Sequence, residues 1–360
     1  MANIYGLIIA GGAGTRFWPA SRRSLPKQLL PLASAGSETL LGATIRRISP
    51  IIPADRLYIA TGDHLADMTA ISAAHVPREQ ILAEPVPRNT APCIAWGVSV
   101  IARRDPDALI AVFPADHHVR DEAAFCQTVA RALDAAKLDR LVTIGIVPTR
   151  VETGYGYIER GAAIGDDIYE VKRFIEKPIA EAAARYVNGG HHFWNAGCFF
   201  FRAKTFLEAL REQLPAVARA MNELDRAAER GDEQAALREL FPQLPSISID
   251  HGIMEKAENV AVVPGEFGWS DVGGWASAWE LADRDSEGNA LPAGAIAIDA
   301  ERNYVADMTT HSQKRLYAIV GMSDLVVIET DDAVLIIPRE RAQDVRTVVQ
   351  ELNARGKGLI

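Results

Sequence analysis

A glycine-rich segment followed by two cations stands near the start of the 360-residue chain. The residues GGAGTR at 11–16 follow an apolar run, and Lys27 comes eleven residues after Arg16. Glycines directly after a buried strand let backbone N–H groups approach phosphate oxygens. The segment is not a P-loop, and Phe17 stands where the dinucleotide fingerprint has its third glycine. Because a plain glycine turn would need no cations beside it, Arg16 and Lys27 predict a triphosphate site with pyrophosphate as the leaving group.

Two carboxylates, one after a predicted strand and one in a predicted turn, could hold a metal ion. Asp116 comes just after the apolar run 108–113, and Asp271 stands in a turn rich in Gly and Trp. Taken alone, Asp116 could equally be a helix cap or a loop acid. As a pair with substrate phosphates, the two predict a Mg²⁺ site, because Mg²⁺ prefers hard oxygens and keeps few protein ligands. His117 and His118 are expected outside the coordination sphere, since imidazole suits Mg²⁺ less well.

The elements around these residues alternate between strands and helices. Short apolar runs at 5–10, 56–60, 108–113 and 141–146 predict strands buried on both faces. Helical spacing covers 39–48, 90–104 and 121–138. The alternation predicts an α/β fold with a doubly wound, mostly parallel, Rossmann-like sheet, whose ligand lies beyond the carboxyl ends of the strands.

The pattern changes after residue 150 and again near residue 285. The first change brings mixed strands (154–160, 168–175, 193–201, 259–264) and helices (180–188, 216–240, with a break at Gly231). The second change is a polar, turn-rich stretch at 283–294, followed by short β runs and a final helix at 341–353. We therefore expect a catalytic domain over 1–285 and a small C-terminal β domain over 286–360, with strands typical of a short β-helix.

Composition excludes several classes of protein. The net charge of −9 makes the chain a poor candidate for non-specific nucleic-acid binding, so any bound anion must meet local positive charge. The three cysteines, Cys93, Cys126 and Cys198, lack the spacing of a disulfide framework or zinc site. The N-terminus lacks the basic region of a signal peptide, and no apolar run reaches the roughly 20 residues of a membrane span. We expect a cytoplasmic protein.

The motifs resemble those of the sugar-nucleotide pyrophosphorylases. The pattern GGxGTRFWPxSxxxxPKQ over 11–28 is similar to the signature of that family, and its FWP and PKQ details resemble the mannose-1-phosphate guanylyltransferase (GDP-mannose pyrophosphorylase) branch. Further segments match the family in order: 84–92, 114–117, 154–158, 174–178, 194–197, 250–256 and 267–275. The tail around 319–345 also resembles the C-terminal part of the family.

The resemblance implies transfer of GMP from GTP to α-D-mannose 1-phosphate, giving GDP-mannose and pyrophosphate, with Mg²⁺ as cofactor. It implies catalytic roles for Arg16 and Lys27 and metal binding by Asp116 and Asp271. The implied nucleotide-binding residues are Gly11, Gly12, Gly14, Thr15, Glu84, Arg88, Asn89 and Thr90. The implied sugar-phosphate-binding residues are Gly154, Glu176, Lys177, Asn195 and Gly197.

Structural roles stay open for several of these residues. Glu84 could be a structural acid rather than a guanine contact. Lys177 could form a surface salt bridge, Asn195 an Asx turn, and Gly154 a hairpin. Trp18, Trp269 and Trp275 are expected to pack in the core or at its rim rather than to stack on a ligand.

Two other functions also stay open. The chain could serve another sugar 1-phosphate, such as a heptose or glucose phosphate, or it could be a catalytically silent regulatory subunit that binds GDP-mannose. An active enzyme is favoured because the charged residues expected to bind the phosphates and the metal are all present: Arg16, Lys27, Asp116, Lys177 and Asp271. Some relatives carry a fused phosphomannose isomerase domain, and a chain ending at Ile360 leaves no room for one, so we expect no isomerase activity. The resemblance also implies a homodimer built through the β domain.

Overall fold

The computed structural model describes residues 3–12, 14–32, 38–312, 315–356 and 358–359. The chain forms two compact units. The large unit comprises Met1–Gly11, Thr44–Ala115 and Val119–Trp269. The small unit comprises Gly12–Ala43, Asp116–His118 and Ser270–Ile360. Within the described ranges, no helix has both the length and the apolar character needed to cross a membrane.

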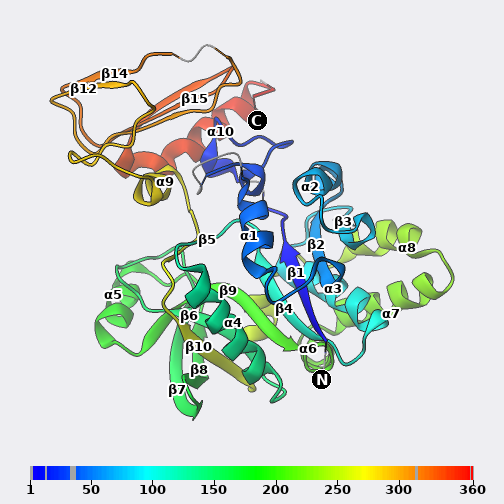
Figure 1. Ribbon diagram of the computed structural model, residues 1–360. Coiled ribbons are helices and arrows are strands. Elements are labelled where there is room, and N and C mark those ends of the chain that lie inside the picture. Colours follow the sequence, from blue (N-terminus) through cyan, green and yellow to red (C-terminus); the bar gives the residue numbers. More distant parts are fainter. Residues whose placement is uncertain (1–2, 13, 33–37, 313–314, 357, 360) are drawn as a thin grey trace. The chain divides into compact units, whose positions relative to one another are not determined.

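A nine-stranded sheet forms the centre of the large unit, in the order β3-β2-β1-β4-β9-β6-β10-β8-β7 (Figure 1). Its strands are β1 (Ile4–Ile9), β2 (Leu57–Gly62), β3 (Ile81–Glu84), β4 (Leu109–Pro114), β6 (Leu141–Ile146), β7 (Tyr157–Gly165), β8 (Ile168–Ile175), β9 (His192–Arg202) and β10 (Val260–Gly265). Strands β3, β2, β1 and β4 are parallel to one another. Strand β9 then runs antiparallel between β4 and β6, and β8 runs antiparallel to both β10 and β7.

Helices cover both faces of this sheet. Val112 of β4 packs in one apolar cluster with Ile94 and Val98 of α3 (Thr90–Arg104). The next residue, Phe113, contacts Phe125 of α4 (Glu122–Ala136), with ring centroids 6.1 Å apart. Because successive strand residues point to opposite faces, α3 and α4 lie on opposite sides of the sheet. The doubly wound α/β class is thereby confirmed.

Further helices complete the large unit, and their bounds mostly follow the sequence pattern. They are α2 (Ala66–Ser72), α5 (Ala180–Gly189), α6 (Ala203–Gln213), α7 (Pro215–Glu229) and α8 (Glu233–Leu240). Helix α1 (Leu40–Ile48) begins in the small unit and continues in the large unit from Thr44. The predicted break at Gly231 is confirmed, since this glycine adopts a φ of 82° between α7 and α8. The strand expected from Gly154 begins only at Tyr157, so the prediction there was wrong by three residues.

The small unit contains two layers of parallel strand pairs. Strand β12 (Ile296–Ile298) pairs with β14 (Ala318–Val320), and β13 (Tyr304–Asp307) pairs with β15 (Leu325–Glu329). Each strand therefore pairs with its counterpart in the next coil, as in a β-helix. Buried Asn303 links the coils, because its side chain donates to the side chain of Asn289 and to the carbonyl of Met322. Strand β16 (Val334–Pro338) pairs antiparallel with β15 and completes a three-stranded sheet in the order β13-β15-β16.

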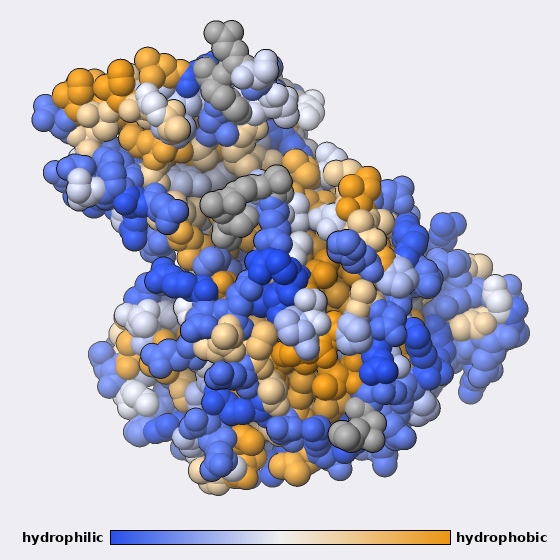
Figure 2. Space-filling model, viewed as in Figure 1, coloured by the Kyte–Doolittle hydropathy of each residue, from blue (hydrophilic) through white to orange (hydrophobic). Residues whose placement is uncertain are grey.

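Apolar side chains remain exposed on the outside of the small unit (Figure 2). They lie on β12, β14 and β16 and include Ile296, Ile298, Val320 and Ile336.

The core of the small unit joins the glycine-rich segment to the C-terminal elements. Trp275, the first residue of α9 (Trp275–Leu281), is fully buried, and its indole N–H donates to the Trp18 carbonyl at 2.9 Å. The Phe17 ring packs edge-on against it, with centroids 5.0 Å apart. Val345 of α10 (Val345–Ala354) belongs to the same apolar cluster. The predicted core positions of Trp18 and Trp275 are therefore confirmed, and the segment after Gly14 is held by residues from the far end of the chain.

Candidate active site

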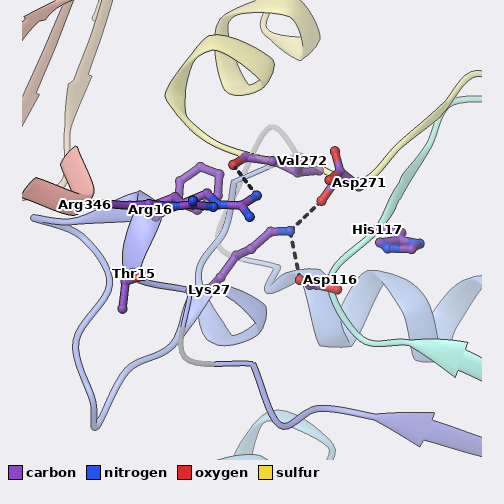
Figure 3. Close-up of a pocket in the computed structure, with 11 residues that line it drawn as sticks. Thr15, Arg16, Lys27, Asp116, His117, Asp271, Val272 and Arg346 are labelled. Atoms are coloured by element: carbon purple, nitrogen blue, oxygen red, sulfur yellow. Dashed lines mark hydrogen bonds and ion pairs between the residues drawn. The ribbon is translucent and has the colours of Figure 1, made fainter. Parts of the chain in front are cut away.

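A cavity of about 420 Å³ in the small unit brings the predicted phosphate and metal residues together (Figure 3). The residues that line it are Gly14, Thr15, Arg16, Phe17, Lys27, Asp116, His117, Asp271, Val272, Gly273 and Arg346. Four separate stretches of the chain contribute, at 14–27, 116–117, 271–273 and 346. The two cations and two carboxylates singled out from the sequence are all present. Gly12 is exposed and is not among the lining residues.

Lys27 links two of the stretches that line this cavity, those of Asp116 and Asp271. The residue is only 7% exposed, and its ammonium donates to Asp116 Oδ2 at 2.8 Å and to the Asp271 carbonyl at 2.5 Å. Gly14 lies directly beneath it with a φ of 59°, and a Cβ there would sit 2.5 Å from Lys27 Cβ. The conformation and the close approach both require glycine at this position. Glycine at position 14 therefore lets the chain pass close to the backbone and Cβ of Lys27.

Electrostatics keep Asp116 ionised. Burial, the largest single effect, raises the pKa of its carboxyl. The charges of Lys27 and His117, together with hydrogen bonds from Lys27 and the backbone, outweigh burial, so the pKa of Asp116 lies below its usual value. Arg16 is half-buried, and its guanidinium donates to the Gly273 carbonyl at 3.3 Å. The cavity thus presents cations beside a carboxylate that is charged at neutral pH.

The turn that carries Asp271 is strained. Val272, the next residue, is fully buried and adopts a φ of 48°. A β-branched residue rarely enters this left-handed region, and such strain tends to persist at functional sites. At Gly273, a Cβ would lie 3.2 Å from both Asp271 carboxylate oxygens. The turn therefore fixes the direction of the Asp271 carboxylate.

The donor set of the cavity fits Mg²⁺. Among the described residues, no group of three or more His, Cys, Asp or Glu side chains is arranged to hold a metal ion. The described residues therefore do not indicate a metal site in which protein side chains supply all the ligands. Asp116 and Asp271 supply hard carboxylate oxygens, and Mg²⁺ is usually held by one or two carboxylates together with substrate phosphates. His117 also lines the cavity, but its imidazole is a weaker match for this ion.

A second group of polar residues lies in the large unit, around Asn195. The Asn195 Oδ1 accepts from Thr143 Oγ1 at 2.9 Å and from the Gly197 amide at 3.1 Å, and the latter contact is an Asx turn. Its Nδ2 donates to Asp250 Oδ1 at 2.9 Å. The single hydroxyl hydrogen of Thr143 can go instead to the Cys198 carbonyl at 3.0 Å. Asn195 can therefore offer a sugar the second hydrogen of Nδ2 and, when Thr143 donates to Cys198, one acceptor position of Oδ1.

Asp250 is a member of this group that the sequence did not single out. It opens a π-helical turn, Asp250–Met254, a geometry that is frequent at functional sites. Burial, and next the charge of Glu176, raise the pKa of Asp250 to about 6. The motif at 250–256 was evident in the sequence, but nothing in it distinguished Asp250 from its neighbours.

Lys177 and Glu176 meet as an ion pair in the same group. Lys177 is exposed and adopts a φ of 46°, which is unusual for a side chain of its size. The glycine that lies against Glu176 is Gly156, where a Cβ would be 2.6 Å from Glu176 Oε2. The predicted Gly154 is exposed and donates its amide to Glu152 instead, so the structure does not bring it to this group.

Glu84 ends β3 with a buried carboxylate that is 5% exposed. Its Oε1 has no hydrogen-bond partner within the described part of the chain. Burial raises the pKa of Glu84 to about 7, although a hydrogen bond with Cys93 partly opposes the shift. Gly11, where a Cβ would be 3.9 Å from Glu84 Oε2, is the nearby part of the glycine-rich segment. A buried acceptor without a partner is a candidate ligand contact.

The residues after Glu84 make structural contacts. Arg88 donates to the Pro242 carbonyl, and the Asn89 side chain caps α3 by accepting from the Thr90 amide at 2.8 Å. Thr90 Oγ1 in turn accepts from the Ile249 amide at 2.9 Å. These residues therefore hold the start of α3 in place, whatever else they contact.

Comparison with known proteins gives the family. The model of the nucleotidyl transferase family matches residues 5–288, which is most of the chain. The chain belongs to this family. A second model, the MannoseP isomerase/GMP-like beta-helix domain, matches residues 294–352, and the expected β-helix character of the C-terminal strands is confirmed.

Named relatives match this chain over nearly its whole length. The xanthan biosynthesis protein XanB of Xanthomonas campestris pv. campestris is 40% identical over 359 residues, which cover 99% of this chain and 75% of that protein. A mannose-1-phosphate guanylyltransferase of Escherichia coli is 37% identical over 357 residues, covering 96% and 73%. A crystal structure from Thermus thermophilus, described as a mannose-1-phosphate geranyltransferase, is 36% identical with a TM-score of 0.86, covering 98% and 99%. The predicted resemblance is thereby confirmed.

Proposed function

We propose that this nucleotidyltransferase transfers GMP from GTP to α-D-mannose 1-phosphate and releases pyrophosphate, forming GDP-mannose. The observation that carries the proposal is the Lys27 ammonium, held beside Asp116 and Asp271 in one cavity with Arg16. A triphosphate needs cations at the bond that breaks and acidic ligands for its Mg²⁺. The names of the relatives support guanine as the base and mannose as the sugar.

The reaction requires no general base on the protein. A phosphate monoester has a second pKa near 6, so the sugar phosphate is largely dianionic at neutral pH and is itself the nucleophile. One of its oxygens attacks the α-phosphorus of GTP, the bond to the β-phosphate breaks, and pyrophosphate leaves with the electron pair. Catalysis then consists of positioning and charge neutralisation.

We assign the residues of this chain separate roles in the reaction. Arg16 and Lys27 neutralise charge that grows on the departing pyrophosphate. Asp116 and Asp271 would hold Mg²⁺, which supplies charge neutralisation on the phosphates when bound. In the large unit, Lys177 binds the phosphate of the sugar substrate, and Glu176 and Asn195 bind its hydroxyls. Asp250 keeps the Asn195 amide oriented, because it accepts from Nδ2 at 2.9 Å.

Substrate specificity is the direct test of this proposal. Pyrophosphate release would be measured with Mg²⁺ for GTP, ATP and UTP, each combined with the 1-phosphates of mannose, glucose and a heptose. We expect one dominant combination, GTP with mannose 1-phosphate. A different dominant combination would retain the chemistry and refute the substrate. If no combination releases pyrophosphate while the protein still binds GDP-mannose, the result would favour a catalytically inactive regulatory subunit.

Glu84 gives a prediction about base selection. A carboxylate can accept from both N1–H and the 2-amino group of guanine, whereas adenine offers no such pair. Glu84→Gln should therefore lower kcat/KM for GTP by about 10- to 100-fold, the range of one or two lost charge-assisted hydrogen bonds, and leave ATP nearly unchanged. Inosine triphosphate is the control, because it lacks the 2-amino group and should lose less. An unchanged ratio of GTP to ATP activity would remove Glu84 from base recognition.

The same carboxylate predicts a pH-dependent stability. The ordinary pKa is 4.5 and the folded value is about 7, so between these pH values the folded protein keeps a proton that the unfolded chain has lost. Stability is therefore lost as pH rises through this window, by up to about 3 kcal/mol. Glu84→Gln should remove the loss, so that urea unfolding finds the variant close to wild type at pH 5 and more stable at pH 8. A difference that stays constant between the two pH values would contradict the assignment.

A further inference from the structure

We propose that Arg346, on helix α10 of the C-terminal β domain, binds the pyrophosphate portion of the nucleotide together with Arg16 and Lys27. The inference rests on the proposed function, since it takes a triphosphate to be the ligand of the cavity. It adds a phosphate-binding residue from outside the part of the chain that matches the nucleotidyl transferase model, residues 5–288.

The position of Arg346 is fixed by the core of the small unit. Arg346 is the second residue of α10, directly after Val345, which is fully buried. Val345 and Val349 pack in the same apolar cluster as Phe17 and Trp18. Phe17 ends the short 3-10 turn Thr15–Phe17 that carries Arg16. One core therefore sets the backbone of both arginines, and both side chains line the same cavity (Figure 3).

Arg346 differs from its neighbours in having no ion-pair partner. Arg341, just before α10, pairs with Asp344 at 2.7 Å, and Arg355, just after it, pairs with Glu351 at 3.3 Å. Arg346 is exposed and makes no hydrogen bond or ion pair with any described residue. In a chain of net charge −9, an arginine that faces a cavity without an acidic partner is suited to an anion from solution.

The charges of the cavity indicate a polyphosphate. Arg16, Lys27 and Arg346 outnumber the two lining carboxylates, and Lys27 already neutralises Asp116 at 2.8 Å. The planar guanidinium of arginine binds phosphate oxygens in pairs, which suits the terminal phosphates of a triphosphate. Because Arg346 shares the cavity with the two cations assigned to the leaving group, we assign it to the pyrophosphate and not to the sugar phosphate.

The test compares Arg346→Gln and Arg346→Lys with a matched control at Arg355, which follows the last residue of α10. Arg355→Gln removes the same charge from the other end of α10, next to an exposed pair with Glu351. Two quantities are measured with Mg²⁺ present: the Kd of inorganic pyrophosphate by calorimetry, and the KM values of GTP, pyrophosphate and mannose 1-phosphate in the two reaction directions.

We expect Arg346→Gln to raise the Kd and KM of pyrophosphate and the KM of GTP by about 10- to 100-fold, the range of one charge-assisted hydrogen bond. Arg346→Lys should recover part of this loss, while Arg355→Gln and the KM of mannose 1-phosphate stay unchanged. Wild-type pyrophosphate affinity in Arg346→Gln would overturn the inference, and so would an equal rise in the KM of mannose 1-phosphate. Pyrophosphate binding that depends on Arg346 in a protein without transferase activity would sustain the inference and refute the proposed function.

Discussion

Replacing Lys27 with methionine should lower kcat on the order of 10²–10³-fold, as loss of one preorganised donor does in other enzymes. The ammonium joins the Asp116 carboxylate to the backbone of Asp271, and under the proposed function it neutralises charge on the leaving pyrophosphate. Steady-state pyrophosphate release with GTP and mannose 1-phosphate measures the effect. Turnover close to wild type would contradict the central role of this residue.

Stability must be separated from catalysis in this experiment. Lys27→Met leaves the Asp116 carboxylate without its 2.8 Å partner. Breaking a fully buried pair costs about 3–5 kcal/mol, and this pair should cost less because the Asp116 side chain is 32% exposed. The double variant Lys27→Met with Asp116→Asn removes both charges, so it should recover much of the stability and none of the activity. Lys204→Met is the matched control, since Lys204 is exposed on α6 and its ammonium lies 3.9 Å from the Glu208 carboxylate.

The second large effect is expected at the two carboxylates of the cavity. Asp116→Asn and Asp271→Asn should each lower turnover on the order of 10²–10³-fold at a fixed, limiting Mg²⁺ concentration. Amides are weaker ligands for Mg²⁺, so the concentration of Mg²⁺ that gives half-maximal rate should rise in both variants. Chelation of Mg²⁺ by EDTA should abolish the activity of the wild type.

The control for these variants is Asp225→Asn. Asp225 accepts from Ser99 at 2.7 Å and pairs with Arg103 in the large unit, so its charge has a structural partner. We expect its Mg²⁺ dependence to equal that of wild type. An unchanged Mg²⁺ requirement in Asp271→Asn would remove that residue from the metal site.

The sequence predicted the cavity well because its residues follow strands and glycine turns. Asp116 comes two residues after β4, and parallel strands deliver the residues at their carboxyl ends to one edge of the sheet. Gly14 was predicted to let the backbone approach a phosphate. The structure gives this glycine a close approach to the backbone and Cβ of Lys27, and its contact with a phosphate stays a prediction. In both cases a local pattern in the chain fixes a local geometry.

Contacts between distant parts of the chain could not be predicted in this way. Apolar runs identify strands without identifying their neighbours, so the antiparallel insertion of β9 between β4 and β6 was not foreseen. The same limit applies to Asp250, whose role depends on Asn195, 55 positions away. Arg346 belongs to no motif, and only the packing of α10 against the segment after Gly14 brings it to the cavity.

Isotope labelling of mannose 1-phosphate tests the central claim most directly. The substrate would carry ¹⁸O in all phosphate oxygens and would react with unlabelled GTP and Mg²⁺, and mass spectrometry would locate the label. Attack of the sugar phosphate on the α-phosphorus predicts that every labelled oxygen stays in GDP-mannose and that the pyrophosphate is unlabelled. Label in the pyrophosphate, or no labelled GDP-mannose from an intact protein, would contradict the account.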